Sequence, residues 1–165
     1  MVLHLSSIYT VVRAIRVPEW DEETRSRTIT FWTQRGMHFF ETGTNVLRAR
    51  RGRLLHNVYS FDNSKLKADL TLTVADLPIV DCVMHIDTSF QDWTDWNRAY
   101  FHLEMVTFET FLLRDDKQEK LWQCFKKDSN LATTRWFISA MFFGRRMSRA
   151  EWAKYTNLPS DSSEG

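Results

Sequence analysis

Two neighbouring segments of the chain, 68–74 and 80–88, alternate apolar and polar residues with the period of two that is typical of a half-buried β-strand. The connection between them is short enough for an antiparallel hairpin. If Val74 pairs with Val80, every apolar residue of the pair falls on one face, as a half-buried antiparallel sheet requires. The further pairs on this face are Leu72 with Cys82, Leu70 with Met84 and Ala68 with Ile86.

A strand and a helix are predicted upstream of the hairpin. Residues 5–17 are rich in β-branched side chains and end before Pro18, which predicts a first strand. Four acidic residues then fall within positions 19–23, where they favour the first turn of a helix. This helix is expected to run to about Arg35, with Gly36 as its left-handed cap.

Two short strands are predicted between this helix and the hairpin, at 37–41 and 46–51, with a turn at 42–44 between them. Residues 53–66 are expected to be irregular or to form a short helical turn. With the first strand and the hairpin, these segments give a sheet of about five strands.

The segment 92–113 has the length of a long helix and is rich in aromatic residues. Its apolar residues occupy two sides of the helix: Phe101, Met105, Phe108 and Leu112 form one stripe, and Leu103, Val106 and Leu113 lie opposite. The narrow polar strip consists of Asp95, Arg98, His102 and Glu109. Such a helix is predicted to be a central packing element with neighbours on more than one face.

The element order β-α-β-β-β-β followed by helices predicts an α+β fold. An antiparallel sheet would be covered on one face by the 92–113 helix. We expect a single domain over 1–158 and a disordered tail over 159–165. Three C-terminal helices are predicted, at 117–127, at 131–144 and after the capping box of 148–151.

Charge is unevenly distributed, although the net charge of the chain is only +1. Segment 45–67 carries six basic and one acidic side chain, whereas segment 68–116 carries two basic and ten acidic ones. Segment 117–165 is basic again, with nine basic and five acidic side chains. Either these segments neutralise one another in the fold, or they form a dipolar surface that binds a charged partner or a second copy of the chain.

Cysteine usage and the N-terminus indicate a cytoplasmic protein. Cys82 and Cys124 lie among apolar residues and are too few for a secreted disulfide framework. The N-terminus lacks the pattern of a signal peptide, and no apolar run is long enough to cross a bilayer. No cofactor is predicted.

Glu104 is the first candidate for chemistry, because it projects from the apolar arc of the 92–113 helix. Asn97, Tyr100, Glu104 and Thr107 share one side of the helix as a polar seam. A carboxyl group among apolar side chains suits a general acid or base, and the seam could line a ligand pocket. The candidate ligand-binding residues are Trp93, Trp96, Asn97, Tyr100, Glu104 and Phe108. The alternative is that Glu104 pairs with an arginine such as Arg13 or bonds to strand backbone.

His85 and Asp87 are weak candidates for a metal site, with Asp69 and Asp81 on the same face of the predicted hairpin. Metal ions need convergent nitrogen and oxygen ligands at short range. Cross-strand pairs on an exposed sheet face give the same pattern in sequence and are far more common. The register places Lys67 opposite Asp87 and Asp69 opposite His85.

Four arginines, Arg48, Arg50, Arg51 and Arg53, lie within six residues and are candidate phosphate or anion ligands. Arg48 and Arg50 would share one strand face, opposite to Leu47 and Ala49. A nucleic-acid partner is disfavoured, because such proteins usually present a broad basic face with exposed aromatic residues. Neutralisation within the fold, or a charged edge strand, is the alternative.

The aromatic stretch 131–143 would complete the core or form part of a subunit interface, where aromatic residues, Met and Arg are enriched. The sequence contains no Gly-rich phosphate loop, nucleophile elbow, HExxH pair, CxxC pair or EF-hand loop. The leading interpretation is a non-catalytic protein-interaction or binding module that self-associates. The alternatives are a small-ligand-binding domain or enzyme built around Glu104, and phosphate or nucleic-acid binding through Arg48–Arg53.

Overall fold

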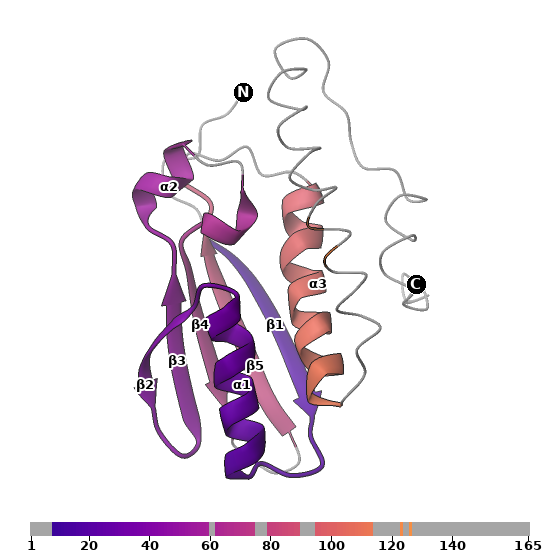
Figure 1. Cartoon of the computed structure of the whole chain (residues 1–165). Coiled ribbons are helices and arrows are strands. Elements are labelled where there is room, and N and C mark those ends of the chain that lie inside the picture. Colours follow the sequence, from indigo (N-terminus) through magenta and orange to yellow (C-terminus); the bar gives the residue numbers. More distant parts are fainter. Residues whose placement is uncertain are drawn as a thin grey trace, which may run out of the picture.

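The computed structural model describes residues 8–59, 62–74, 79–89, 95–113, 123 and 126. These residues form a five-stranded antiparallel sheet and three α-helices, which confirms the α+β fold (Figure 1). The elements in chain order are β1 (Ile8–Arg16), α1 (Glu22–Gln34), β2 (His38–Thr42), β3 (Val46–Arg51), α2 (Leu54–Tyr59), the short 3-10 helix η1 (Asn63–Lys65), β4 (Ala68–Thr73), β5 (Ile79–Asp87) and α3 (Asp95–Leu112).

The strands lie in the order β1-β5-β4-β3-β2, so β1 and β2 form the two edges of the sheet. The pairs predicted for the hairpin are present between β4 and β5, where Leu72, Leu70 and Ala68 lie opposite Cys82, Met84 and Ile86. All six side chains are buried on the inner face of the sheet. A shift of one residue would turn them to the outer face, so burial fixes this register.

Helix α1 begins and ends where its sequence indicates. Its N-cap residue, Asp21, accepts a hydrogen bond from the backbone N–H of Thr24 at 2.7 Å, which satisfies one of the unpaired donors of the first turn. Gly36 follows the helix with a φ of 80°, in the left-handed region that favours glycine. Phe31 and Trp32 of this helix are fully buried in the core.

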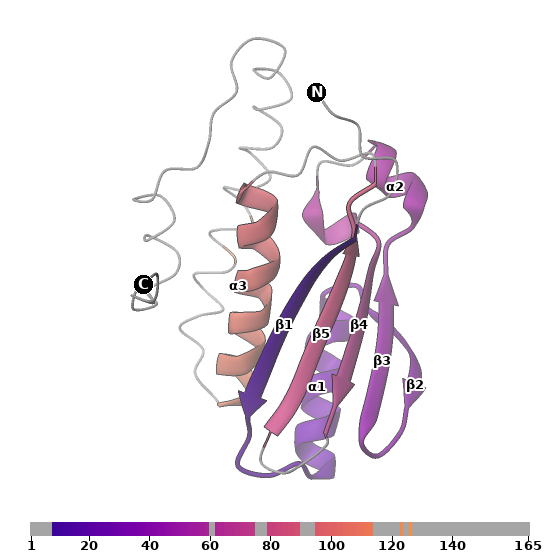
Figure 2. The same ribbon diagram turned by 180° about the vertical axis from the view of Figure 1, so that it is seen from behind.

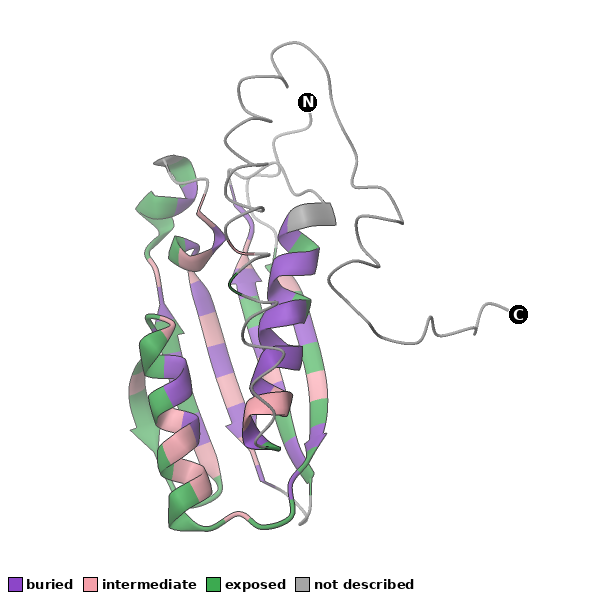
Figure 3. Cartoon of the chain, turned by 45° about the vertical axis from the view of Figure 1, so that its right-hand side comes forward, coloured by how far each residue is buried: buried purple, intermediate pink, exposed green. Residues whose placement is uncertain are grey.

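Helices α1 and α3 lie on the inner side of the sheet, and α3 is buried along most of its described length (Figure 3). The rings of Phe31 and Trp32 pack on Phe108 of α3, each with ring centroids 5.1 Å apart. Phe101 and Phe108 are both 0% exposed, which confirms the prediction that this helix is a central packing element. On its polar strip, Arg98 and His102 are exposed.

The opposite, outer face of the sheet is not covered by α1 or α3, as the view from behind shows (Figure 2). It carries the alternate residues of each strand, which are exposed or half-buried. Segment 53–66 forms two short helical elements, α2 and η1, at one end of the sheet, in agreement with a helical turn rather than a wholly irregular segment (Figure 1).

Among the described residues, no helix combines the length and the apolar character needed to span a bilayer. The helices predicted at 117–127, at 131–144 and after 148–151 lie outside the continuous stretches that the structure describes, as does the predicted tail.

Candidate functional site

Glu104 forms a buried ion pair with Arg51. The Nη1 and Nη2 atoms of Arg51 donate hydrogen bonds to the two carboxylate oxygens of Glu104, both at 2.6 Å. The side chains are 1% and 0% exposed. Arg51 Nη1 also donates to the backbone oxygen of Arg35 at 3.3 Å. This bidentate geometry is the strongest arrangement that an arginine and a carboxylate can form.

The strand alternation brings Arg51 to this position. Leu47, Ala49 and Arg51 occupy every second residue of β3, so the guanidinium enters the core from the same face as two apolar side chains. Burial by itself lowers the pKa of Arg51, but the charge and hydrogen bonds of Glu104 outweigh it and hold this pKa above its ordinary value. Arg51 is therefore charged at neutral pH.

The other polar residues of the α3 seam are also engaged within the fold. The side-chain amide of Asn97 donates to Asn63 Oδ1 at 2.7 Å, and the Thr107 hydroxyl donates to the Leu103 carbonyl at 2.7 Å. Tyr100 is buried, and this burial together with the charge of Glu104 raises the pKa of its phenol well above its ordinary value.

The residues predicted to line a ligand pocket along α3 have different environments in the structure. Phe108 packs in the aromatic core, and Glu104 is held by a charged partner on β3. Trp93 and the side chain of Trp96 lie outside the described residues. Both oxygens of the Glu104 carboxylate accept hydrogen bonds from Arg51.

Arg13, the arginine named from sequence as an example of a partner for Glu104, pairs with Glu109 instead. Its Nε donates to Glu109 Oε2 at 2.6 Å. The sequence contained a signal for the true partner, because Arg51 shares the inward face of its strand with Leu47 and Ala49. The sequence-based prediction places only Arg48 and Arg50 on a strand face and does not use the inward position of Arg51 to pair it with Glu104.

The four arginines of the candidate anion site do not share one face. Arg51 lies in the core, whereas Arg48 and Arg50 lie on the outer face. Arg48 Nη1 donates to Glu41 at 3.0 Å, and Arg50 Nε donates to Asp69 at 2.5 Å. Arg53 is exposed after the end of the strand. Three of the four therefore have carboxylate partners in the fold, which supports neutralisation over anion binding.

The candidate metal residues on β5 have partners of their own. His85 Nδ1 and the Thr10 hydroxyl are hydrogen-bonded at 3.0 Å, and Asp87 pairs with Lys67 Nζ at 3.3 Å. Asp87 also accepts a hydrogen bond from the Ser89 backbone N–H at 3.0 Å. Within the described part of the chain, no group of three potential ligands converges on a point that could hold a metal ion.

The outer face of β1 and β5 carries an exposed apolar patch. Val12 on the edge strand is 65% exposed and lies opposite the half-buried Val83. Ala14 and Ile79 add apolar surface towards one end of the two strands. Thr10, His85 and Asp81 surround the patch with polar groups. An apolar centre with a polar rim is the usual composition of a protein–protein interface.

Comparisons with known proteins provide no independent guide to this surface or to the buried pair. No protein-family model matches the sequence, and neither a curated protein nor a solved structure matches the chain.

Proposed function

We propose that this chain is a non-catalytic protein-interaction module that binds a second copy of itself through the outer face of β1 and β5. The observation that carries the proposal is the pair Val12–Val83, an apolar cross-strand pair on a sheet face that α1 and α3 leave open. Exposed apolar patches with a polar rim mark interaction surfaces more often than isolated apolar residues do.

The residues around this pair are self-complementary, as a two-fold interface requires. His85 and Asp81 lie two positions to either side of Val83 on the same face. Consider a two-fold axis that lies parallel to the sheet and crosses the strands at Val12 and Val83. This axis places each His85 opposite Asp81 of the second copy. The same axis brings Val12 onto Val12 and Val83 onto Val83, so the apolar groups meet at the centre.

The state of Glu104 supports a binding role over an enzymatic one. A general acid or base must be able to exchange a proton with a bound substrate. Glu104 is fully buried and has both oxygens bonded to Arg51. The buried pair accounts for the one carboxylate that the sequence singled out as a catalytic candidate.

Light scattering coupled to size exclusion tests the proposal. We expect the wild-type chain to have twice the mass of the 19.6 kDa monomer at micromolar concentration. The variant Val12→Asp should be monomeric, because a charge at the centre of the interface would lose its hydration. Leu55→Asp is the matched control, since Leu55 is 63% exposed but lies on α2. A monomeric wild type, or a Val12→Asp variant that remains dimeric, would refute this interface.

A further inference from the structure

Helix α2 buries the polar residue Asn57 and exposes three apolar residues. Asn57 is 0% exposed, whereas Leu54, Leu55 and Val58 are 46%, 63% and 48% exposed. A helix on the surface of a soluble domain normally turns its apolar stripe towards the core. This orientation exposes apolar surface to water at a cost to folding stability. A binding partner that covers the exposed side chains would account for it.

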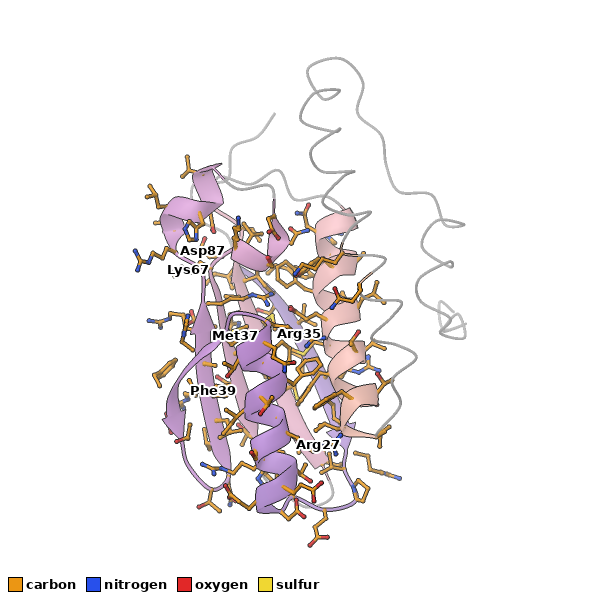
Figure 4. The ribbon with its side chains drawn as sticks, viewed as in Figure 1. Arg27, Arg35, Met37, Phe39, Lys67 and Asp87 are labelled. Atoms are coloured by element: carbon orange, nitrogen blue, oxygen red, sulfur yellow. The ribbon has the colours of Figure 1, made fainter. Side chains whose placement is uncertain are left out.

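Hydrogen bonds of Asn57 fix this orientation. Its Nδ2 atom donates to the backbone oxygen of Asp87 at 2.7 Å, and its Oδ1 atom accepts from the backbone N–H of Lys67 at 3.1 Å. One amide therefore ties α2 to the end of β5 and to the start of β4. Figure 4 shows Lys67 and Asp87 directly beneath the helix. Rotating α2 to bury its leucines would leave a buried amide and two backbone groups without these bonds.

Exposed cations flank the apolar tip of α2, which consists of Leu54, Leu55 and Val58. Four of the six basic residues in segment 45–67 have carboxylate partners: Arg48 with Glu41, Arg50 with Asp69, Arg51 with Glu104 and Lys67 with Asp87. The other two, Arg53 and Lys65, are exposed and form no ion pair with a described residue. Arg53 immediately precedes α2, and Lys65 ends η1.

The acidic side chain of segment 45–67 is half-buried and hydrogen-bonded within η1. Asp62 is the one acidic residue in segment 45–67, and its side chain accepts hydrogen bonds from the backbone and hydroxyl of Ser64 at 2.9 and 2.6 Å. The tip thus presents apolar side chains with net positive charge on both sides.

We infer that α2 is a membrane-docking tip that binds the surface of an anionic lipid bilayer. Leu54, Leu55 and Val58 would enter the boundary between headgroups and acyl chains, while Arg53 and Lys65 would contact the lipid phosphates and carboxylates. Helix α2 lies beyond one end of the described sheet (Figure 1).

The charge pattern favours a lipid surface over a protein partner. Binding to a bilayer interface combines apolar insertion with attraction between cations and anionic headgroups, and the tip supplies both components side by side. Each component alone is weak because the helix is short. The inference is independent of the proposed self-association, because the tip and the Val12–Val83 patch share no residue.

Co-sedimentation with lipid vesicles tests the inference. We expect the wild-type chain to sediment with vesicles of phosphatidylcholine and phosphatidylserine, and to do so much less with phosphatidylcholine alone or at high salt. Leu55→Asp and Arg53→Glu should each lower the bound fraction several-fold. Phe40→Asp is the matched control, since Phe40 is 61% exposed but lies on the edge strand β2, and its binding should equal that of the wild type.

Three results would overturn the inference. The first is no sedimentation of the wild type with anionic vesicles, and the second is equal binding by wild type and Leu55→Asp. The third is a change in oligomeric mass caused by Leu55→Asp, which would assign the tip to a protein partner. Because all substituted side chains are exposed, an unchanged thermal unfolding curve establishes that each variant is folded.

Discussion

At the scale of single residues, Arg51 and Glu104 form an ion pair that is almost completely buried in the core. Both charges are removed from water, so the pair must recover the cost of desolvation through its two short hydrogen bonds. Either side chain alone would be an uncompensated charge among aromatic rings, with Phe101 lying 5.7 Å from the guanidinium carbon. The two residues are therefore interdependent.

Replacing one member of the pair should cost far more stability than replacing both. We expect Glu104→Gln to lower the free energy of unfolding by about 3 to 5 kcal/mol, because Arg51 would remain buried without a counter-charge. The double variant Arg51→Met with Glu104→Leu should recover most of this loss. It also removes Arg51 Nε, a buried donor that has no acceptor among the described residues. Urea unfolding of the three chains measures the difference, and additive effects would contradict the coupling.

Two glycines allow a backbone effect to be separated from a steric one. Gly36 and Gly52 both have positive φ, at 80° and 68°. A Cβ atom at Gly36 would meet no atom within 4 Å, whereas one at Gly52 would overlap the carbonyl oxygens of Lys65 and Leu66. We expect Gly36→Ala to cost about 1 kcal/mol from backbone conformation alone. Gly52→Ala should lower the unfolding temperature clearly further, and equal shifts for the two variants would contradict the close approach at Gly52.

At the scale of elements, the described fold was predictable where local pattern and burial agree. The alternation in 68–74 and 80–88 gave the register of β4 and β5, because a half-buried sheet needs all its apolar residues on one face. The long helix α3 was predictable from its apolar arcs in the same way. Both predictions rest on many residues whose patterns favour the same structure.

Two features of the candidate sites were not predicted because they depend on contacts between distant segments. The orientation of α2 is set by two hydrogen bonds of Asn57 to the ends of β4 and β5, which no local periodicity reveals. The partner of Glu104 lies 53 positions away on β3. Its inward position follows from strand parity, but its pairing depends on how α3 lies over the sheet.

The contact between β1 and α3 should make stability depend on pH. His102 Nε2 and the Tyr9 hydroxyl are hydrogen-bonded at 2.9 Å. Although His102 is exposed, partial desolvation of its ring and secondly the charge of Arg13 lower its pKa in the folded chain. The unfolded chain therefore binds the proton more readily, and stability should fall as pH drops from the ordinary histidine pKa of about 6.5 towards the lower folded value. His102→Gln, which cannot titrate, should lose less stability in urea unfolding between these pH values, and an equal loss would exclude this residue as the cause.

At the scale of the whole molecule, the two faces of the sheet differ in burial and in composition. The inner face, with α1 and α3, contains the aromatic core and the buried ion pair, and its residues are engaged with one another. The outer face and the α2 tip carry exposed apolar groups, including Val12, Phe40 and Leu55. Interaction surfaces are therefore expected on the outer face and at the end of the sheet, with the inner face serving as their rigid support.

Self-association through β1 and β5 should make thermal stability depend on protein concentration. A second copy that binds only the folded chain shifts the folding equilibrium by mass action, so the unfolding temperature should rise as the protein is concentrated. The variant Val12→Asp should unfold at a temperature that does not change with concentration, because it has no partner to bind. Calorimetric scans at a low and a high concentration provide the measurement, with Leu55→Asp as the control that keeps the wild-type dependence. A concentration-independent unfolding temperature for the wild type would show that the exposed Val12–Val83 pair faces solvent in the functional molecule.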